Sequence, residues 1–176
     1  MSAKYHPGEI EVQKRAGVRP MAERVGNSIH STIPHAAREF LEEQLMVVVG
    51  SVDADGRVWA SLLVSEPGFV RVLDERTVRI DATPLPGDPL EEVLQGAGAK
   101  VGVLSIDLPT RRLLRLSSEA ERRPDGIYVR SCQAYANCPK YIQIREPRTS
   151  GGRRLEDRVR SDSNLHSRPL SPPAIR

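Results

Sequence analysis

Aromatic residues are scarce in this sequence: they make up 4% of its 176 residues, and Trp59 is the single tryptophan. No apolar run approaches the length of a membrane-spanning helix, and the charged opening "MSAKYHPGEIEVQKRAG" lacks the apolar stretch of a secretory signal. These absences predict a soluble, cytoplasmic protein without a membrane partner. The 39% of hydrophobic residues suffice for the core of one domain.

Cysteine is scarce too, and the familiar catalytic motifs are missing. Cys132 and Cys138 form neither a C-x-x-C pair nor a disulfide framework, so we expect two reduced thiols, buried or half-buried, without a catalytic role. The histidines show no metal-binding spacing, and no H-E-x-x-H, P-loop or G-x-S-x-G motif occurs. We therefore predict no metal site, and hydrolase chemistry is not indicated.

The net charge of +3 is concentrated at one end of the chain. Residues 148–176 contain seven arginines and three acidic residues, a net +4 that leaves residues 1–147 with −1. This segment has no aromatic and few aliphatic residues, so burial cannot offset its ordering entropy, and we expect a disordered basic tail. Nucleic-acid binding by the tail ranks third among our interpretations, because the tail has no aromatic side chain for stacking on bases.

The remaining chain divides into a helical arm, residues 1–33, and a folded domain, residues 34–147. The arm contains a short predicted helix over residues 8–16. The domain opens with a second predicted helix in "IPHAAREFLEEQL", in which Pro34 stands early and one face collects apolar residues, namely Ala37, Phe40, Leu41 and Leu45.

Seven apolar segments at short spacing predict strands. "MVVVGSVD" and "RVWASLLVS" flank the turn "DADG", and "GFVRVLD" and "TVRIDA" flank the turn "DER". The capped helix "DPLEEVLQ", with Asp88 at the N-cap and Pro89 at N1, precedes "KVGVLSIDL", "RRLLRLSSEAE" and "IYVRSCQAY". Within "RRLLRL" we place Arg112 and Arg115 together on a solvent-exposed face. The pattern predicts a mainly β antiparallel barrel with small helices at its ends.

The string "GAGAKVG" (residues 96–102) has the composition of a dinucleotide-binding glycine loop. Such a loop leaves a strand and opens a helix, so that its amides face the pyrophosphate. Here the string leaves a helix and enters a strand. We therefore interpret it as an ordinary helix-to-strand connection.

In this order, "HPGEIEVQKRAGV", "DADGRVWASLLVSEPGFVRVLDERTVRID", "GDPLEEVL" and "ANCPKYIQ" resemble the pyridoxamine 5'-phosphate oxidase-like family of flavin-binding split barrels. The resemblance runs from about Tyr5 to Glu146 and is most specific in "GRVWASLLVSEPGF" and "NCPKYIQ". It implies an antiparallel split β-barrel that binds FMN at a homodimer interface, with each site built from both barrels. Longer proteins that look similar carry a second barrel, and here "GSVDADGRVWASLLVSEPGFV" occurs once, so two chains would pair isologously.

FMN combines a dianionic phosphate with a flat apolar ring that is edged by donors and acceptors. Its site needs cations or amides at one end and flat apolar surface at the other. The resemblance makes segment 137–141 a candidate for both. Lys140 would be a cation for the phosphate or the ring edge, Asn137 an amide hydrogen-bonding group, and Tyr141, or Tyr135 before it, a stacking surface.

The resemblance places the flavin along "RVWASLLVS". Alternation puts Trp59 and Ser61 on one face of this strand and Ala60 and Leu62 on the other. The small Ala60 would let a ring approach the backbone, and Ser61 could donate its hydroxyl to a phosphate or a flavin carbonyl. The cofactor-binding candidates are therefore Trp59, Ala60, Ser61, Leu62, Asn137, Lys140 and Tyr141.

Two departures from the family pattern bear on the activity. Well-known oxidases of the family carry a phosphate-binding arginine where Ser61 stands, so Lys140, Arg57 or Arg79 would have to compensate. Their arginine and histidine pattern for the substrate's phosphate is also missing, so pyridoxamine phosphate is not the expected substrate.

The resemblance then implies an FMN-dependent oxidoreductase acting on an unknown small substrate. No acid, base or nucleophile pair is evident, so the catalytic residues stay unknown and enzymatic activity stays open. The alternatives are a non-enzymatic flavin carrier or sensor, or a truncated family remnant.

Overall fold

A computed structural model describes residues 5–147, and the basic segment 148–176 lies outside them. The helices are α1 (Pro7–Arg15), α2 (Arg19–Gly26), α3 (Ala37–Glu42), α4 (Pro89–Val93) and the 3-10 turn η1 (Pro139–Tyr141). The strands are β1 (Met46–Val52), β2 (Val58–Val64), β3 (Val70–Val72), β4 (Thr77–Ile80), β5 (Ala99–Asp107), β6 (Arg112–Arg123) and β7 (Gly126–Tyr135). Within these residues no helix combines the length and the hydropathy that crossing a membrane requires.

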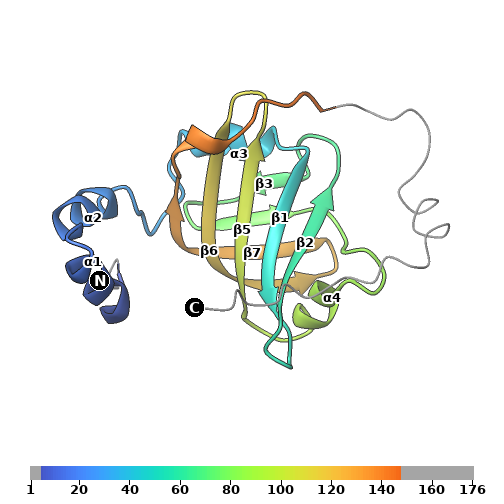
Figure 1. Cartoon of the computed structure of the whole chain (residues 1–176). Helices are drawn as coiled ribbons and strands as arrows, with labels where there is room; N and C mark the ends of the chain where they lie inside the picture. Colours follow the sequence, from blue (N-terminus) through green and yellow to red (C-terminus); the bar gives the residue numbers. More distant parts are fainter. Residues whose placement is uncertain (1–4, 148–176) are drawn as a thin grey trace.

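The seven strands form one antiparallel sheet in the order β2-β1-β5-β6-β7-β4-β3. The sheet curls so that β6, β5, β1 and β2 lie in front of β7, β4 and β3 (Figure 1). Strands β2 and β3 end the order without pairing to each other, which leaves the barrel split along one side. The predicted mainly β antiparallel split barrel is confirmed.

Alternating side chains build the core between the two layers. Val47 and Val49 of β1 are buried, and so are Val101 and Val103 of β5. The small helices close the ends of the barrel, since Leu41 of α3 and Leu90 of α4 are fully buried. The split barrel therefore keeps a continuous apolar interior although its seam is not hydrogen-bonded.

Asp53 organises the turn between β1 and β2. Its Oδ1 accepts hydrogen bonds from the backbone amides of Asp55 (3.0 Å) and Arg57 (2.9 Å), and its Oδ2 accepts one from the Arg57 guanidinium at 2.7 Å. Gly56 supplies the positive φ of 79° that the tight turn requires. These bonds fix the register of β2, in which Met46 stands opposite Val64.

The N-terminal helices α1 and α2 stand to one side of the barrel (Figure 1). His6 caps α1 and Glu9 completes the capping box, while Pro20 lies in the first turn of α2, a helix that the sequence analysis did not identify. His30 pairs with Ala134 through two backbone hydrogen bonds of 3.0 and 2.8 Å, which join the following segment to β7.

The helix predicted in "IPHAAREFLEEQL" is shorter than expected. It spans Ala37–Glu42, and Leu45 is partly exposed instead of sharing the buried face of Phe40 and Leu41. The chain leaves the helix at Glu43 because it must turn into β1, which begins at Met46. Tertiary pairing here outweighs the local helical pattern.

Candidate functional site

Strand β2 presents two different faces, as its alternation predicts. Ser61 and Leu63 are buried and Trp59 is half-buried, whereas the intervening side chains point away from the core. Those outward side chains are unusually apolar for an edge strand: Val58 is 59% exposed, Leu62 49% and Val64 47%. An exposed apolar edge of this kind is characteristic of an interaction surface.

The outward side chains continue the apolar surface across the neighbouring strands. Successive antiparallel pairs align one row from β2 to β7, consisting of Leu62, Val48, Leu104, Arg115 and Tyr135. From β2 to β6 this row crosses three strand spacings, about 14 Å. It therefore changes along its length from aliphatic side chains to a guanidinium and a phenol.

A parallel row of small and polar residues lies beside the first. It consists of Ala60, Gly50, Gly102, Ser117 and Gln133. A side chain added at Gly102 would meet no atom within 4 Å, and one added at Gly50 would first meet the Gly102 carbonyl oxygen at 3.6 Å. The row is thus an open trough next to a ridge of aliphatic side chains, and we call the two rows together the outer face.

The part of the outer face that β6 contributes carries a positive charge. Arg115 is exposed, and within residues 5–147 it takes part in no ion pair. Arg115 stands opposite Leu104 on one side and Tyr135 on the other. A ligand that combines an anionic group with an apolar ring could bind Arg115 through the anion and contact the apolar side chains of this face through the ring.

The opposite end of β2, near α4, is acidic. A hollow of about 290 Å³ there is bordered by four carboxylates, namely Asp53, Asp88, Glu91 and Glu92. Arg57 also borders it, but its guanidinium already pairs with Asp53 and Asp55, at 2.7 Å each. A phosphate would be repelled at this end, and Arg57 does not provide the compensating cation that the sequence analysis considered.

Two of the predicted site residues have structural partners at the end of β2 that lies near α4. The indole Nε1 of Trp59 donates to Asp53 Oδ2 at 2.8 Å, and the Ser61 hydroxyl donates to Asp88 Oδ1 at 2.6 Å. Asp88 in turn caps α4 by accepting from the Leu90 amide at 2.9 Å. Of the four candidates on β2, only Ala60 and Leu62 lie on the outer face.

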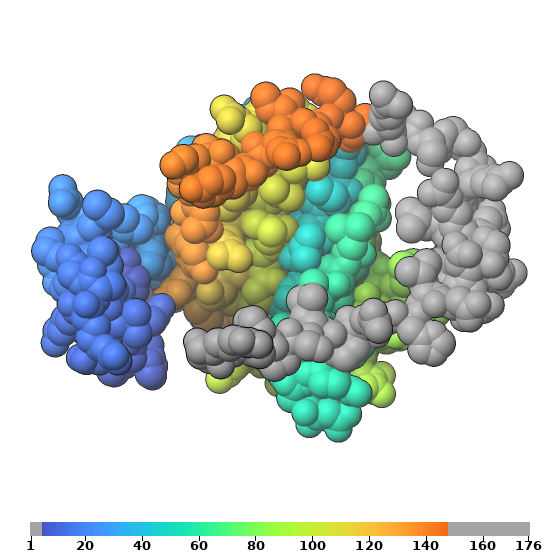
Figure 2. Space-filling model, in the orientation of Figure 1, coloured from blue at the N-terminus to red at the C-terminus, as the bar shows by residue number. Residues whose placement is uncertain are grey.

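The other candidates, Asn137, Lys140 and Tyr141, lie in the segment that follows β7. All three are exposed, Tyr141 to 85%, and Lys140 Nζ lies 5.4 Å from the centre of the Tyr141 ring. The segment runs along the upper border of the outer face (Figures 1 and 2). None of five hollows in residues 5–147 is lined by both Trp59 and Lys140.

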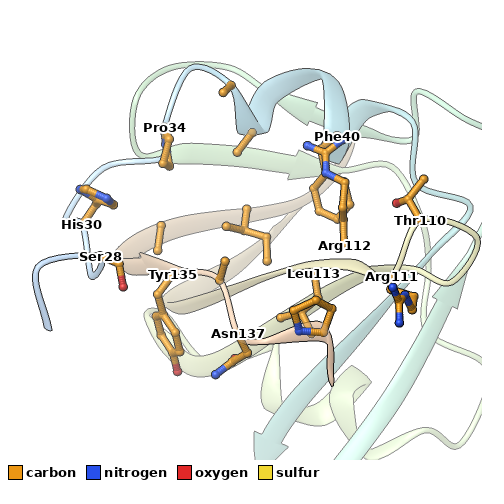
Figure 3. A pocket seen from close by; sticks show the side chains of 16 residues that line it. Ser28, His30, Pro34, Phe40, Thr110, Arg111, Arg112, Leu113, Tyr135 and Asn137 are labelled. Atoms are coloured by element: carbon orange, nitrogen blue, oxygen red, sulfur yellow. The ribbon is translucent and has the colours of Figure 1, made fainter. Parts of the chain in front are cut away.

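A second hollow, which we call the α3 cavity, opens between α3, the turn that joins β5 to β6, and the segment that follows β7 (Figure 3). Its volume is about 460 Å³. Phe40, Leu114 and Ala134 form its apolar floor, while Arg112 and Asn137 stand among its polar groups. Asn137, which belongs to the segment beside the outer face, therefore also lines this cavity.

The structure corrects two expectations and adds residues that the sequence analysis missed. Arg112 and Arg115 lie on opposite faces of β6, because an odd spacing of three places two strand residues on opposite sides. Cys132 and Cys138 are free but exposed, not buried. Gly50 and Gly102 were missed because only the cross-strand register brings them together. The sequence analysis did not recognise Arg115 as a candidate site residue, because its neighbours in the row belong to other strands.

The comparisons with known proteins are sparse. No protein-family model and no curated protein matches the sequence. The described residues 5–147 contain no group of three potential metal ligands. Among solved structures, a variant of HupZ from group A Streptococcus shares 14% identity over 60% of this chain and 99% of its own, with a TM-score of 0.46. An F420 reductase shares 14% identity over 60% of this chain and 97% of its own, with a TM-score of 0.34. At such scores the similarity carries no argument about function.

Proposed function

We propose that the protein binds FMN on the outer face, between the barrels of two identical chains. The observation that carries this proposal is the row that changes from the aliphatic side chains of Leu62, which is exposed, and Val48, which is half-buried, to the guanidinium of Arg115, which forms no ion pair within residues 5–147. Such a row offers apolar surface for a flat ring and a cation for its phosphate. The resemblance of the sequence to flavin-binding split barrels agrees with this use.

The trough favours a planar ligand over a bulky one. At Gly50 and Gly102 no side chain rises from the sheet, and Ala60 beside them adds a single methyl group. A ring can therefore lie close to the backbone while the ridge at Leu62 and Leu104 contacts its edge. Among the candidates on β2, Ala60 and Leu62 thus keep a direct role, and Trp59 and Ser61 act by holding the strand in place.

The phosphate would be held at the end of the outer face away from α4. Arg115 is the cation of this row and forms no ion pair within residues 5–147, and Lys140 lies in the segment along the upper border of this face. The carboxylates around α4 repel a dianion from the other end of β2. Charge therefore selects one orientation of the cofactor along the sheet.

A second copy of the chain would complete the site. The exposed outward residues Val58, Leu62 and Val64 gain from burial against an identical surface, and a two-fold axis would bring the same strands together. The exposed Tyr141 of one chain would then be available to cover a ring bound by the other. Isologous pairing thereby supplies the covering surface that one barrel lacks.

FMN, when bound, would supply hydride and electron transfer, and the protein would orient it and exclude water. The two rows of the outer face contain no carboxylate and no histidine, so proton transfer by a side chain is not part of the proposal. Lys140 or Arg115 would place positive charge near the reduced ring or the phosphate. We propose an oxidoreductase on a small substrate, and binding of FMN without turnover of NADH or NADPH would identify a carrier or sensor instead.

Titration of the full-length protein with FMN, followed by flavin fluorescence, tests the proposal. We expect Arg115→Gln to weaken binding by about tenfold or more, because a charge-assisted hydrogen bond is lost. Lys140→Ala should weaken binding in the same direction. Arg24→Gln, at an exposed arginine on α2, is the matched control and should bind like the wild type. Equal affinities of the Arg115 and Arg24 variants would refute this placement of the flavin.

A further inference from the structure

The α3 cavity differs in charge from the other hollows of the molecule. Each of the four other hollows that we compared within residues 5–147 has at least one carboxylate in its lining. Among the described residues, the lining of the α3 cavity contains no carboxylate but has Arg111, Arg112 and His30. Its electrostatic character therefore favours an anion.

Arg112 is held in a position from which it can bind a ligand. Its guanidinium carbon lies 4.9 Å from the centre of the Phe40 ring, and Figure 3 shows the two side chains facing each other. Stacking uses the flat face of the guanidinium and leaves the N–H groups at its edge free to donate. Neither Arg112 nor Arg111 forms an ion pair within the described part of the chain. Within residues 5–147 the Arg112 guanidinium is therefore an oriented donor that forms no ion pair.

Backbone hydrogen bonds hold the walls of the α3 cavity in place. His30 and Ala134 exchange two hydrogen bonds, and the Ile33 amide donates to the Glu75 carbonyl at 2.7 Å, so the segment between α2 and α3 is held against the barrel. Phe40, Leu114 and Ala134 in the floor are buried at their places in the core. A cavity of about 460 Å³ with such a floor falls within the usual range for small-molecule sites.

We propose that the α3 cavity binds a small aromatic carboxylate, distinct from the flavin on the outer face. The ring would contact Phe40 and Leu114, and the carboxylate would accept hydrogen bonds from the edge of Arg112. A carboxylate fits better than a phosphate because the apolar lining penalises a second negative charge, while the guanidinium fork matches two carboxylate oxygens. Arg111 beside it adds positive potential at the mouth.

Calorimetric titration of the full-length protein with 3-phenylpropionate tests this assignment. We expect saturable binding of the acid, and at least about tenfold weaker binding of the uncharged 3-phenylpropanamide, because the amide lacks the charge-assisted bond. Arg112→Gln should lower the affinity for the acid by a similar factor, and Arg24→Gln should leave it unchanged. No measurable binding of the acid, or equal binding of acid and amide, overturns the proposal.

A second variant distinguishes loss of binding from loss of folding. Ala136 lines the cavity from the exposed segment after β7, so Ala136→Phe fills the space without entering the core. It should abolish binding of the acid while thermal unfolding stays that of the wild type. Unaltered affinity in this variant would exclude the cavity as the site.

Addition of saturating FMN separates this proposal from the flavin site. FMN should leave the affinity for 3-phenylpropionate unchanged, and Arg115→Gln should leave it unchanged as well. Displacement of the acid by FMN would mean that the cavity belongs to the flavin site, and the inference of a separate ligand would be wrong. Failure to bind FMN with retained binding of the acid would refute only the function proposed above.

Discussion

The indole Nε1 of Trp59 donates a hydrogen bond to Oδ2 of Asp53 at 2.8 Å, which connects β2 to the turn that precedes it. Partial desolvation alone would raise the pKa of Asp53. The hydrogen bonds from Trp59 and from the amide and guanidinium of Arg57, together with the charge of Arg57, outweigh it and lower the pKa to about 2. The only tryptophan is thus part of the structural turn and not of an open platform.

This pair predicts a pH-dependent signal from one residue. The folded pKa lies below the ordinary value of 3.8, so the stabilisation from Asp53 is complete above about pH 4 and is lost as the pH falls towards 2. We expect Trp59 emission to change over this interval, measured beside far-UV circular dichroism to detect unfolding. Asp53→Asn should remove this change, and an identical profile in the variant would contradict the assignment.

The Ser61 hydroxyl donates a hydrogen bond to Asp88, so we expect Ser61 to contribute to stability and not to the proposed flavin affinity. We expect Ser61→Ala to lower the free energy of unfolding by about 2 kcal/mol, the usual size for a hydrogen bond to a charged group. FMN affinity should change little. A chemical denaturation curve measures the first effect, and a flavin titration the second.

Ser105 is the matched control for this substitution. Ser105 is 1% exposed and Ser61 3%, and the Ser105 hydroxyl has no hydrogen-bond partner among residues 5–147. Ser105→Ala should therefore be neutral or slightly stabilising. If both alanine variants lose the same stability, the Ser61–Asp88 bond is not the cause.

Arg111 has a φ of 60° in the turn between β5 and β6, and it is the one residue other than glycine with positive φ in residues 5–147. We expect Arg111→Gly to raise the free energy of unfolding by about 1 kcal/mol, because glycine adopts this conformation without steric cost. Arg112→Gly, at the first residue of β6, should lower it. Thermal unfolding of the two variants compares them directly.

The outer face should govern the oligomeric state. Leu62→Arg places a charge among its exposed aliphatic side chains and should convert a dimer to a monomer and abolish FMN binding. Leu73→Arg is a close control, since Leu73 is 48% exposed and Leu62 49%, but Leu73 follows β3 at the far end of the sheet order. Sedimentation velocity should show a smaller species for the Leu62 variant alone. A monomeric wild-type protein would refute the pairing.

Much of the fold was predictable because it rests on short-range patterns. Alternation and turn residues identified all seven strands, and Asp88 with Pro89 marked the start of α4. The helix from Pro34 was overextended, and α2 was missed, because helices of such length depend on packing that local sequence does not reveal.

The candidate site was predictable only in part. Alternation predicted that β2 has two faces, but it did not predict that the face with Trp59 and Ser61 would bond to Asp53 and Asp88. Arg115 and Tyr135 join Leu62 through pairings between β2, β1, β5, β6 and β7, several of them distant in sequence. Local chemistry along the chain settled which residues form strands and which way each points. The register of the folded sheet settled which of them become neighbours, because cross-strand contacts depend on pairing and not on sequence separation.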